Sequence, residues 1–204
     1  MIASTAIVIV AKRAFPADNL KEFIAHVKKS EKSVTEAHGG VGSIAHTTCT
    51  LLKSIIGTNT ARVAYRGTGQ SMSDLIAGQV DFGCDQITNV VPQAQAGTIK
   101  AFAVASGERS PALKDVPTTT EAGLPEFKVS AWQALFAPKG TPAARVAKLN
   151  DALAKSLNDE GTRKRLIDLG SVIPDDPDRS PDAVQKLVEN EVARWGRVLK
   201  TINQ

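Results

Sequence analysis

The sequence contains few of the residues on which several functional classes depend. Aromatic residues make up 4% of its 204 residues, histidine occurs 3 times and cysteine 2 times. The aromatic residues are not interleaved with lysine or arginine, so the stacking surfaces and basic stripes of nucleic-acid-binding proteins are missing. Histidine and cysteine show no metal-ligand spacing. We therefore expect no nucleic-acid partner, no metal site and no cofactor.

Long apolar runs are also lacking, and none approaches the length of a transmembrane helix. The apolar start of the chain has neither the basic residues nor the small-residue cleavage site of a signal peptide. β-Branched residues between Thr5 and Val10 predict a strand there instead.

The two cysteines fall in different patterns, Cys49 in a helical one and Cys84 in a strand. We expect both as buried free thiols, with a disulfide as the open alternative. Two cysteines of this kind do not assign a redox compartment.

The remaining composition is that of an ordinary globular protein, with 42% hydrophobic and 23% charged residues. Its length suits one large or two small domains. The net charge of +4 is a mild basic excess, which favours anionic small molecules as ligands.

Up to residue 105, strand and helix patterns alternate. Strands are expected at 5–10, 33–36, 62–65, 80–84 and 99–105, and helices at 20–27, 44–56, 69–76 and 87–95. Asn19 and Glu22 predict a capping box, and Gly57 predicts a helix end. This alternation predicts an α/β fold with a mainly parallel sheet, whose ligand lies beyond the carboxyl ends of the strands.

The glycine-rich stretch at residues 39–46 follows one of these strands and opens a helix. Free backbone N–H groups and the helix dipole make such a turn a place to hold an anion. A second glycine turn at Gly67 and Thr68 and the carboxylate of Asp85 also follow strand ends. We therefore expect all three to meet at one edge of the sheet.

Other interpretations of these residues remain open. Gly40 and Gly42 can form an ordinary tight turn, and Asp85 can be a helix cap. Ser43 and His46 could form a nucleophile and base, but no orienting acid is evident. No lysine follows the glycines as in a Walker motif, and the dinucleotide fingerprint is incomplete. We expect His26 and His38 at the surface and His46 in local hydrogen bonds or packed under the turn.

The chain changes character after Ser106. Thr118 and Glu121 predict a capping box for a short helix that ends at Gly123. Residues 127–138 are expected to be extended, and three amphipathic helices follow. Thr141 should cap the first with Pro142 at its start, the second should run over 160–169, and Ser180 should cap the third.

Four stretches together resemble a known family. They are residues 40–46, residues 63–69 with 74–81, residues 109–118 with 121–125, and residues 135–142. In this order they resemble the periplasmic solute-binding proteins of the tripartite tricarboxylate transporter system, the Bug family. The resemblance covers essentially the whole chain.

The resemblance implies a type II-like periplasmic binding protein with two Venus-flytrap lobes. Residues 1–130 would form a complete ligand-binding lobe two, and residues 131–204 a hinge strand and three helices of lobe one. The family's signal peptide and the first half of lobe one have no counterpart here, so we expect a truncated protein. Its uncovered apolar helix faces are expected to promote self-association.

The resemblance also implies function. It predicts non-enzymatic binding of a di- or tricarboxylate, an acidic amino acid or an aromatic acid, in the periplasm, for the membrane subunits of a transporter. The implied ligand-binding residues are Gly40, Val41, Gly42, Ser43, Ile44, His46, Gly67, Thr68 and Asp85. A ligand-sensing domain or an α/β enzyme acting on an anionic small molecule is the alternative.

Overall fold

The computed structural model describes the backbone of residues 1–202 and the side chains of residues 1–200. The chain divides into two compact units. Unit 2 is Ala6–Ala131, and unit 1 joins Met1–Thr5 to the chain from Trp132 onward. The first five residues therefore belong with the C-terminal part, and the interpretation of the units as lobes stays a prediction.

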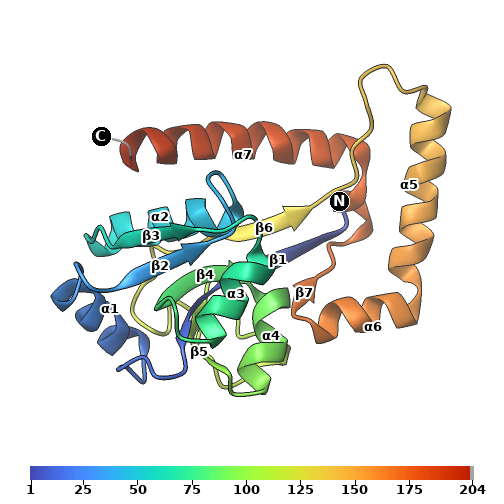
Figure 1. Ribbon diagram of the computed structural model, residues 1–204. Helices are drawn as coiled ribbons and strands as arrows, with labels where there is room; N and C mark the ends of the chain where they lie inside the picture. The colour runs from blue at the N-terminus through green and yellow to red at the C-terminus, as the bar shows by residue number, and fades with distance from the viewer. Residues whose placement is uncertain (203–204) are drawn as a thin grey trace. The chain divides into compact units, whose positions relative to one another are not determined.

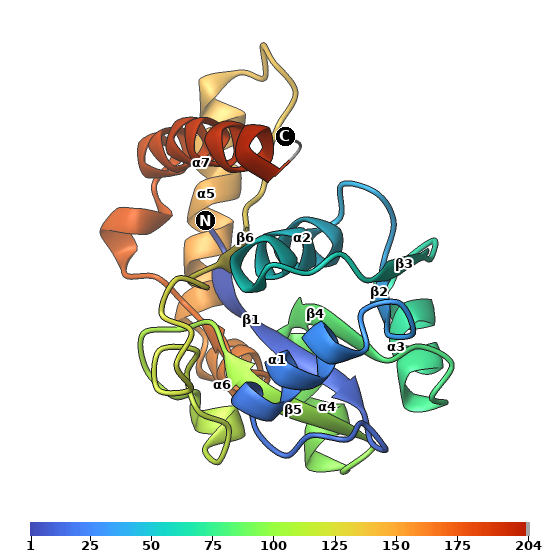
Figure 2. The same cartoon turned by 90° about the vertical axis from the view of Figure 1, so that its left-hand side faces the viewer.

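Unit 2 is built on a mixed sheet. Its strands are β1 (Ala3–Lys12, which begins in unit 1), β2 (Thr35–His38), β3 (Ala61–Ala64), β4 (Phe82–Gln86) and β5 (Ile99–Val104), in the order β3-β2-β4-β1-β5. β2 is parallel to β3 and β4, whereas β1 is antiparallel to β4 and β5. Figures 1 and 2 show β1, in dark blue, between these two strands. The predicted α/β class with a mainly parallel sheet is confirmed, and β1 is its antiparallel member.

Helices cover both faces of this sheet. They are α1 (Leu20–Lys29), α2 (Ile44–Ile56), α3 (Thr68–Ile76) and α4 (Ile87–Gln95), with a short 3-10 turn, η1 (Pro111–Leu113). Phe23 of α1 packs on Phe82 and Phe102 on one face. On the other face, α3 and α4 pack against Val8 and Val10 of β1. Hydrophobic burial on both faces of β1 explains why it is apolar from Ala6 to Ala11.

Local signals place several boundaries where the sequence predicts them. α2 and α4 span the expected residues. The side chain of Ser43 accepts a hydrogen bond from the N–H of His46 at 3.2 Å, and Gly57 ends α2 with a φ of 69°. The predicted capping box at Thr118 and Glu121 forms, but residues 119–123 are turns and not a helix. So short a segment gains too few hydrogen bonds to propagate a helix.

Unit 1 contains the second half of β6 (Ser130–Gln133), which begins in unit 2, and the elements that follow it. These are α5 (Ala143–Asn158), α6 (Glu160–Asp168), β7 (Ser171–Val172), η2 (Asp176–Arg179) and α7 (Pro181–Ile202). β7 pairs with the start of β1, with Ser4 opposite Val172. Ser180 caps α7 as predicted. The predicted cap at Thr141 is wrong, because its hydroxyl donates to the carbonyl of Pro138 at 2.8 Å and Pro142 stands at the cap of α5.

Apolar side chains of unit 1 remain exposed, among them Phe136 at 64%, Leu149 at 48% and Val192 at 69%. A cavity of about 280 Å³ lies between α5, the start of α7 and the segment before α5. Self-association through these faces stays a prediction. The described part of the chain has no helix with the length and apolar character needed to cross a bilayer.

Asp81, just before β4, ties three strands of unit 2 together and provides a test of the fold. Its carboxylate accepts hydrogen bonds from the N–H and hydroxyl of Thr35 at 2.7 and 2.9 Å, and it pairs with Lys12 at 2.7 Å. Burial alone would raise the pKa of Asp81, but the Lys12 and Thr35 contacts outweigh it and hold the pKa below 3.8.

Asp81→Asn is therefore expected to lower the free energy of unfolding by about 1–3 kcal/mol at neutral pH. A carboxyl group with a lowered folded-state pKa stabilises above its unfolded pKa and loses this effect as the pH falls through the folded value. The difference between wild type and variant in urea unfolding should thus shrink below pH 3.8. Asp168→Asn, in an exposed pair with Lys164, is the control. An unchanged difference at acid pH would contradict the assignment.

Candidate functional site

The glycine-rich turn joins the carboxyl end of β2 to α2. Gly40 and Gly42 have φ values of 113° and 81°, a region that side chains with a Cβ rarely adopt. Ser43 caps α2, and the helix presents its positive dipole end to the turn. The first N–H groups of the helix, those of Ile44 and Ala45, lie beyond the reach of any intrahelical carbonyl.

The second predicted turn adjoins the first. Gly67 precedes α3, and Thr68 is its first residue. A Cβ on Gly39 would lie 3.0 Å from the backbone nitrogen of Thr68 and 3.2 Å from its hydroxyl oxygen. The two turns therefore touch along the backbone, because β2 and β3 are parallel neighbours whose carboxyl ends meet.

Tyr65 supports this junction from the end of β3. Its N–H donates to the carbonyl of His38 at 2.9 Å. Its phenol donates to Asp74 of α3 at 2.6 Å, and this bond, with burial, raises the pKa of Tyr65 to about 12. The second turn is thereby held to both β2 and α3.

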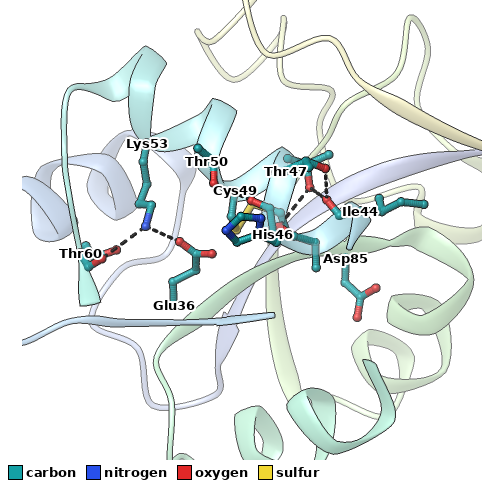
Figure 3. The surroundings of a disulfide bond; sticks show 12 residues. Glu36, Ile44, His46, Thr47, Cys49, Thr50, Lys53, Thr60 and Asp85 are labelled. Carbon is teal, nitrogen blue, oxygen red and sulfur yellow. Dashed lines mark hydrogen bonds and ion pairs between the residues drawn. A yellow bond between two sulfur atoms is a disulfide. The ribbon is translucent and has the colours of Figure 1, made fainter. Parts of the chain in front are cut away.

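Asp85 of β4 is buried, with 8% of its surface exposed. Its carboxylate accepts hydrogen bonds from the N–H of Gln86 and the side chain of Asn89. It lines a cavity of about 10 Å³ with Ala45 and Ser71, about the room of one water molecule. Figure 3 shows the carboxylate directed away from the disulfide. Burial raises the pKa of Asp85 in spite of its bonds. Its contact with a ligand stays a prediction.

Two N–H groups of the first turn are already in use. The N–H of Gly40 donates to Nδ1 of His38 at 3.2 Å, and that of Gly42 donates to Nδ1 of His46 at 3.3 Å. The glycines thus shape the turn, and the donors left for an anion are the hydroxyls of Ser43 and Thr68 and the first N–H groups of α2.

The expected surface position of His38 is wrong, because only 2% of its surface is exposed. Its place directly before the glycines was the signal available in the sequence. His26 is partly buried and lies edge-on to Phe15. The predicted local hydrogen bond of His46 is present. Because Nδ1 of that ring faces Gly42 and Ser43 contacts only the backbone of His46, the described contacts form no catalytic pair.

The expectation of free thiols is also wrong. Cys49 and Cys84 form a disulfide with a Cα–Cα distance of 5.3 Å across 35 residues of sequence. The bond joins α2, which carries the glycine turn, to β4, which carries Asp85 (Figure 3). Spatial proximity alone decides this pairing, so the sequence offered no signal for it.

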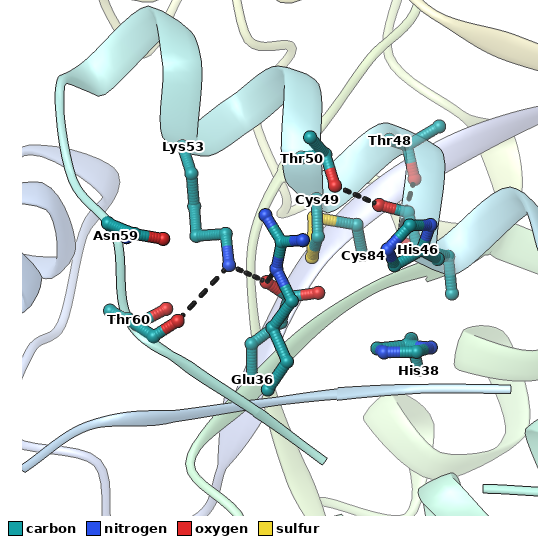
Figure 4. A network of polar contacts seen from close by, with 12 residues as sticks. Glu36, His38, His46, Thr48, Cys49, Thr50, Lys53, Asn59, Thr60 and Cys84 are labelled. Carbon is teal, nitrogen blue, oxygen red and sulfur yellow. Dashed lines mark hydrogen bonds and ion pairs between the residues drawn. A yellow bond between two sulfur atoms is a disulfide. The ribbon is translucent and has the colours of Figure 1, made fainter. Parts of the chain in front are cut away.

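A buried ion pair lies beside the disulfide (Figure 4). Glu36 of β2 is fully buried, and its carboxylate lies 2.5 Å from the ammonium of Lys53 and 3.9 Å from Nε of Arg62. Lys53 also donates to the carbonyl of Thr60. Burial raises the pKa of Glu36 and lowers that of Lys53, because it penalises both charges. The sequence signal was a lysine on the inward face of α2, in line with Cys49 and Ile56.

The described residues contain no group of three or more His, Cys, Asp or Glu side chains placed to hold a metal ion. What the turns present is a set of neutral donors at two helix starts. Such a set suits an oxyanion held by hydrogen bonds, without a cationic side chain.

Comparison with known proteins identifies the family of the chain. The family model described as "Tripartite tricarboxylate transporter family receptor" matches residues 1–204. A UPF0065 protein of Agrobacterium vitis is 36% identical over 98% of this chain and 58% of its own length. The chain thus spans less than two thirds of that relative.

Two solved structures are similar to nearly the whole chain. MatC of Rhodopseudomonas palustris, with bound malate, is 41% identical, with a TM-score of 0.93 over 96% of this chain and 67% of its own. The periplasmic binding protein BugD is 36% identical, with a TM-score of 0.94 over 98% and 67%. The resemblance predicted from four sequence stretches is confirmed, and its members are binding proteins and not enzymes. The chain belongs to the tripartite tricarboxylate transporter receptor family.

Proposed function

We propose that this chain binds a small carboxylate such as malate and presents it to the membrane subunits of a tripartite transporter. The observation that carries the proposal is the contact between two helix-starting turns at one sheet edge. It occurs in a chain 41% identical to a protein whose structure holds malate.

In this proposal the ligand carboxylate accepts hydrogen bonds from Ser43, Thr68 and the first N–H groups of α2. The dipoles of α2 and α3 add to the attraction. Gly40, Gly42 and Gly67 let the backbone approach the ligand, while the exposed side chains of Val41 and Ile44 contact its carbon skeleton. His46 supports the turn through its bond to Gly42, and Asp85 faces the ligand from β4. By the family resemblance, a second loop completes the grip when two lobes close, and that loop belongs to the half of lobe one that has no counterpart in this sequence.

We also propose that the protein acts outside the cytoplasm. The disulfide between Cys49 and Cys84 supports this, because such bonds persist in oxidising compartments. The similarity to the periplasmic binding protein BugD supports it independently.

Ser43→Ala tests the proposed site. We expect it to weaken malate binding by about 1–3 kcal/mol, the scale of a hydrogen bond to a charged group. Loss of the helix cap should also cost about 0.5–2 kcal/mol of stability. Calorimetry with malate measures the first effect and urea unfolding the second.

Ser180→Ala is the matched control. Ser180 caps α7 with the same geometry, accepting from the N–H of Ala183 at 3.2 Å. The Ser180→Ala variant should lose about as much free energy of unfolding as Ser43→Ala, but it should bind malate with the affinity of the wild type. If both variants bind malate with equal affinity, Ser43 is not part of the site. If malate does not raise the melting temperature of the wild-type chain, the result counts against the proposed function.

A further inference from the structure

Two histidine rings lie directly beneath the glycine turn. His38 is the last residue of β2 and His46 is the third residue of α2. Their ring centroids are 4.7 Å apart at an interplanar angle of 55°. Figure 4 shows the two rings facing one another beside the Glu36–Lys53 pair. Strand end and helix start are thus joined by side chains as well as by the turn.

Each ring accepts a hydrogen bond from one of the two glycines of the turn that have positive φ. His38 accepts from Gly40 and His46 from Gly42, in both cases through Nδ1. A ring nitrogen can accept only when it carries no proton, so both bonds require the neutral tautomer with hydrogen on Nε2. The turn in this conformation is therefore compatible only with two uncharged imidazoles.

The surroundings contain charges of both signs. On the elements packed around the pair, the titratable or charged side chains are Glu36 on β2, Lys53 on α2, Arg62 on β3, Asp74 on α3 and Asp85 on β4. Glu36 is paired with Lys53, and Asp74 accepts from Tyr65. Burial lowers the pKa of His46, and the charges of His38, Arg62 and Lys53 lower it further. Burial and these positive charges thus favour the neutral form of His46.

We propose that His38 and His46 are positioning residues which shape the glycine turn for carboxylate binding, and that protonation of either ring opens the turn and weakens binding. A protonated Nδ1 would face an N–H group instead of accepting from it. A second proton would place two cations side by side next to Lys53 and Arg62. The inference rests on the proposed function, since carboxylate affinity is one of its readouts.

Substitution by asparagine tests the proposal. The Oδ1 atom of asparagine can take the place of Nδ1 as an acceptor, but it does not titrate. His46→Asn should keep malate affinity within about threefold of the wild type near pH 7 and lose part of its decline toward about pH 5. His46→Leu removes the acceptor and should lose about tenfold near pH 7. His38→Asn should behave like His46→Asn.

His26→Asn is the matched control. His26 is on α1, where its ring lies against that of Phe15 and not against the glycine turn. The His26→Asn variant should therefore keep the pH profile of the wild type. Malate itself titrates in the acid range, and this affects every variant equally. The readout is therefore the difference between pH profiles. Identical profiles for the wild type, His38→Asn and His46→Asn would overturn the proposal while leaving carboxylate binding intact.

Nitrogen-15 NMR of the free protein provides a test without ligand. We expect both rings as the Nε2–H tautomer, and we expect the amide signals of Gly40 and Gly42 to shift as the rings titrate. The proposal would be overturned if either ring carried its proton on Nδ1. It would also be overturned if the amide signals of Gly40 and Gly42 did not shift as the rings titrate. A coupled titration in a chain that binds no malate would support the positioning role and contradict the proposed function.

Discussion

Replacing Lys53 with methionine is expected to lower the free energy of unfolding by about 3–5 kcal/mol at neutral pH, since it leaves the charge of Glu36 buried without a partner. Glu36 has no exposed surface, and neither of its oxygens receives a well-directed hydrogen bond from the described residues. The ion pair with Lys53 at 2.5 Å is therefore the main compensation for burying this carboxylate. Chemical unfolding followed by circular dichroism measures the loss.

The stability of the Lys53→Met variant should also depend on pH. Burial raises the pKa of Glu36, so its protonated form is favoured in the folded state and stability falls as the pH rises through that pKa. The Lys53→Met variant should thus recover stability as the solution is acidified. A Glu36→Leu substitution in the same variant should restore much of the stability at neutral pH, because no buried charge remains.

Lys164→Met is the matched control for Lys53→Met. Lys164 pairs with Asp168 at 2.6 Å, but both side chains are more than half exposed. Its replacement should change the free energy of unfolding by about 0.5 kcal/mol or less. Equal effects at Lys53 and Lys164 would show that the buried pair is not required.

Reduction of the disulfide is expected to lower the free energy of unfolding by about 2–4 kcal/mol. The bond closes a loop across 35 residues, which restricts the unfolded chain. In the folded state it joins α2 to β4, so its loss removes a link between the glycine turn and Asp85. Urea unfolding with and without a reducing agent measures the effect.

A double variant with Cys49→Ala and Cys84→Ala separates the bond from other effects of the reductant. It should unfold at a lower urea concentration than the oxidised wild type, and the reducing agent should change nothing further. If oxidised and reduced wild type unfold together, the disulfide does not stabilise the protein.

Elements set by local sequence were predicted well. α2 lies between a serine cap and a glycine that adopts positive φ, and both signals act within one turn of the helix end. α4 begins and ends at the expected residues, although it contains Pro92. The capping box at Thr118 shows where this reasoning stops, because its hydrogen bonds form without a helix. Local bonds decide a cap, whereas a helix also needs length and packing.

The candidate site was predicted in part. The contact between the turns at Gly39 and Thr68 follows from parallel strands, whose carboxyl ends share an edge. The use of the Gly40 and Gly42 N–H groups by His38 and His46 did not follow, because no pattern indicates which acceptor reaches a turn. The ligand-binding roles of Ser43, Thr68 and Asp85 stay predictions.

The sequence by itself determined the alternation of strands and helices, most helix ends and the family, because these depend on neighbouring residues or on their order along the chain. The tertiary structure alone decided the antiparallel place of β1, the bond between Cys49 and Cys84, and the burial of Glu36 with Lys53. Each of these is a contact between residues distant in sequence. Their free energy comes from burial and desolvation, which exist only once the elements have packed together.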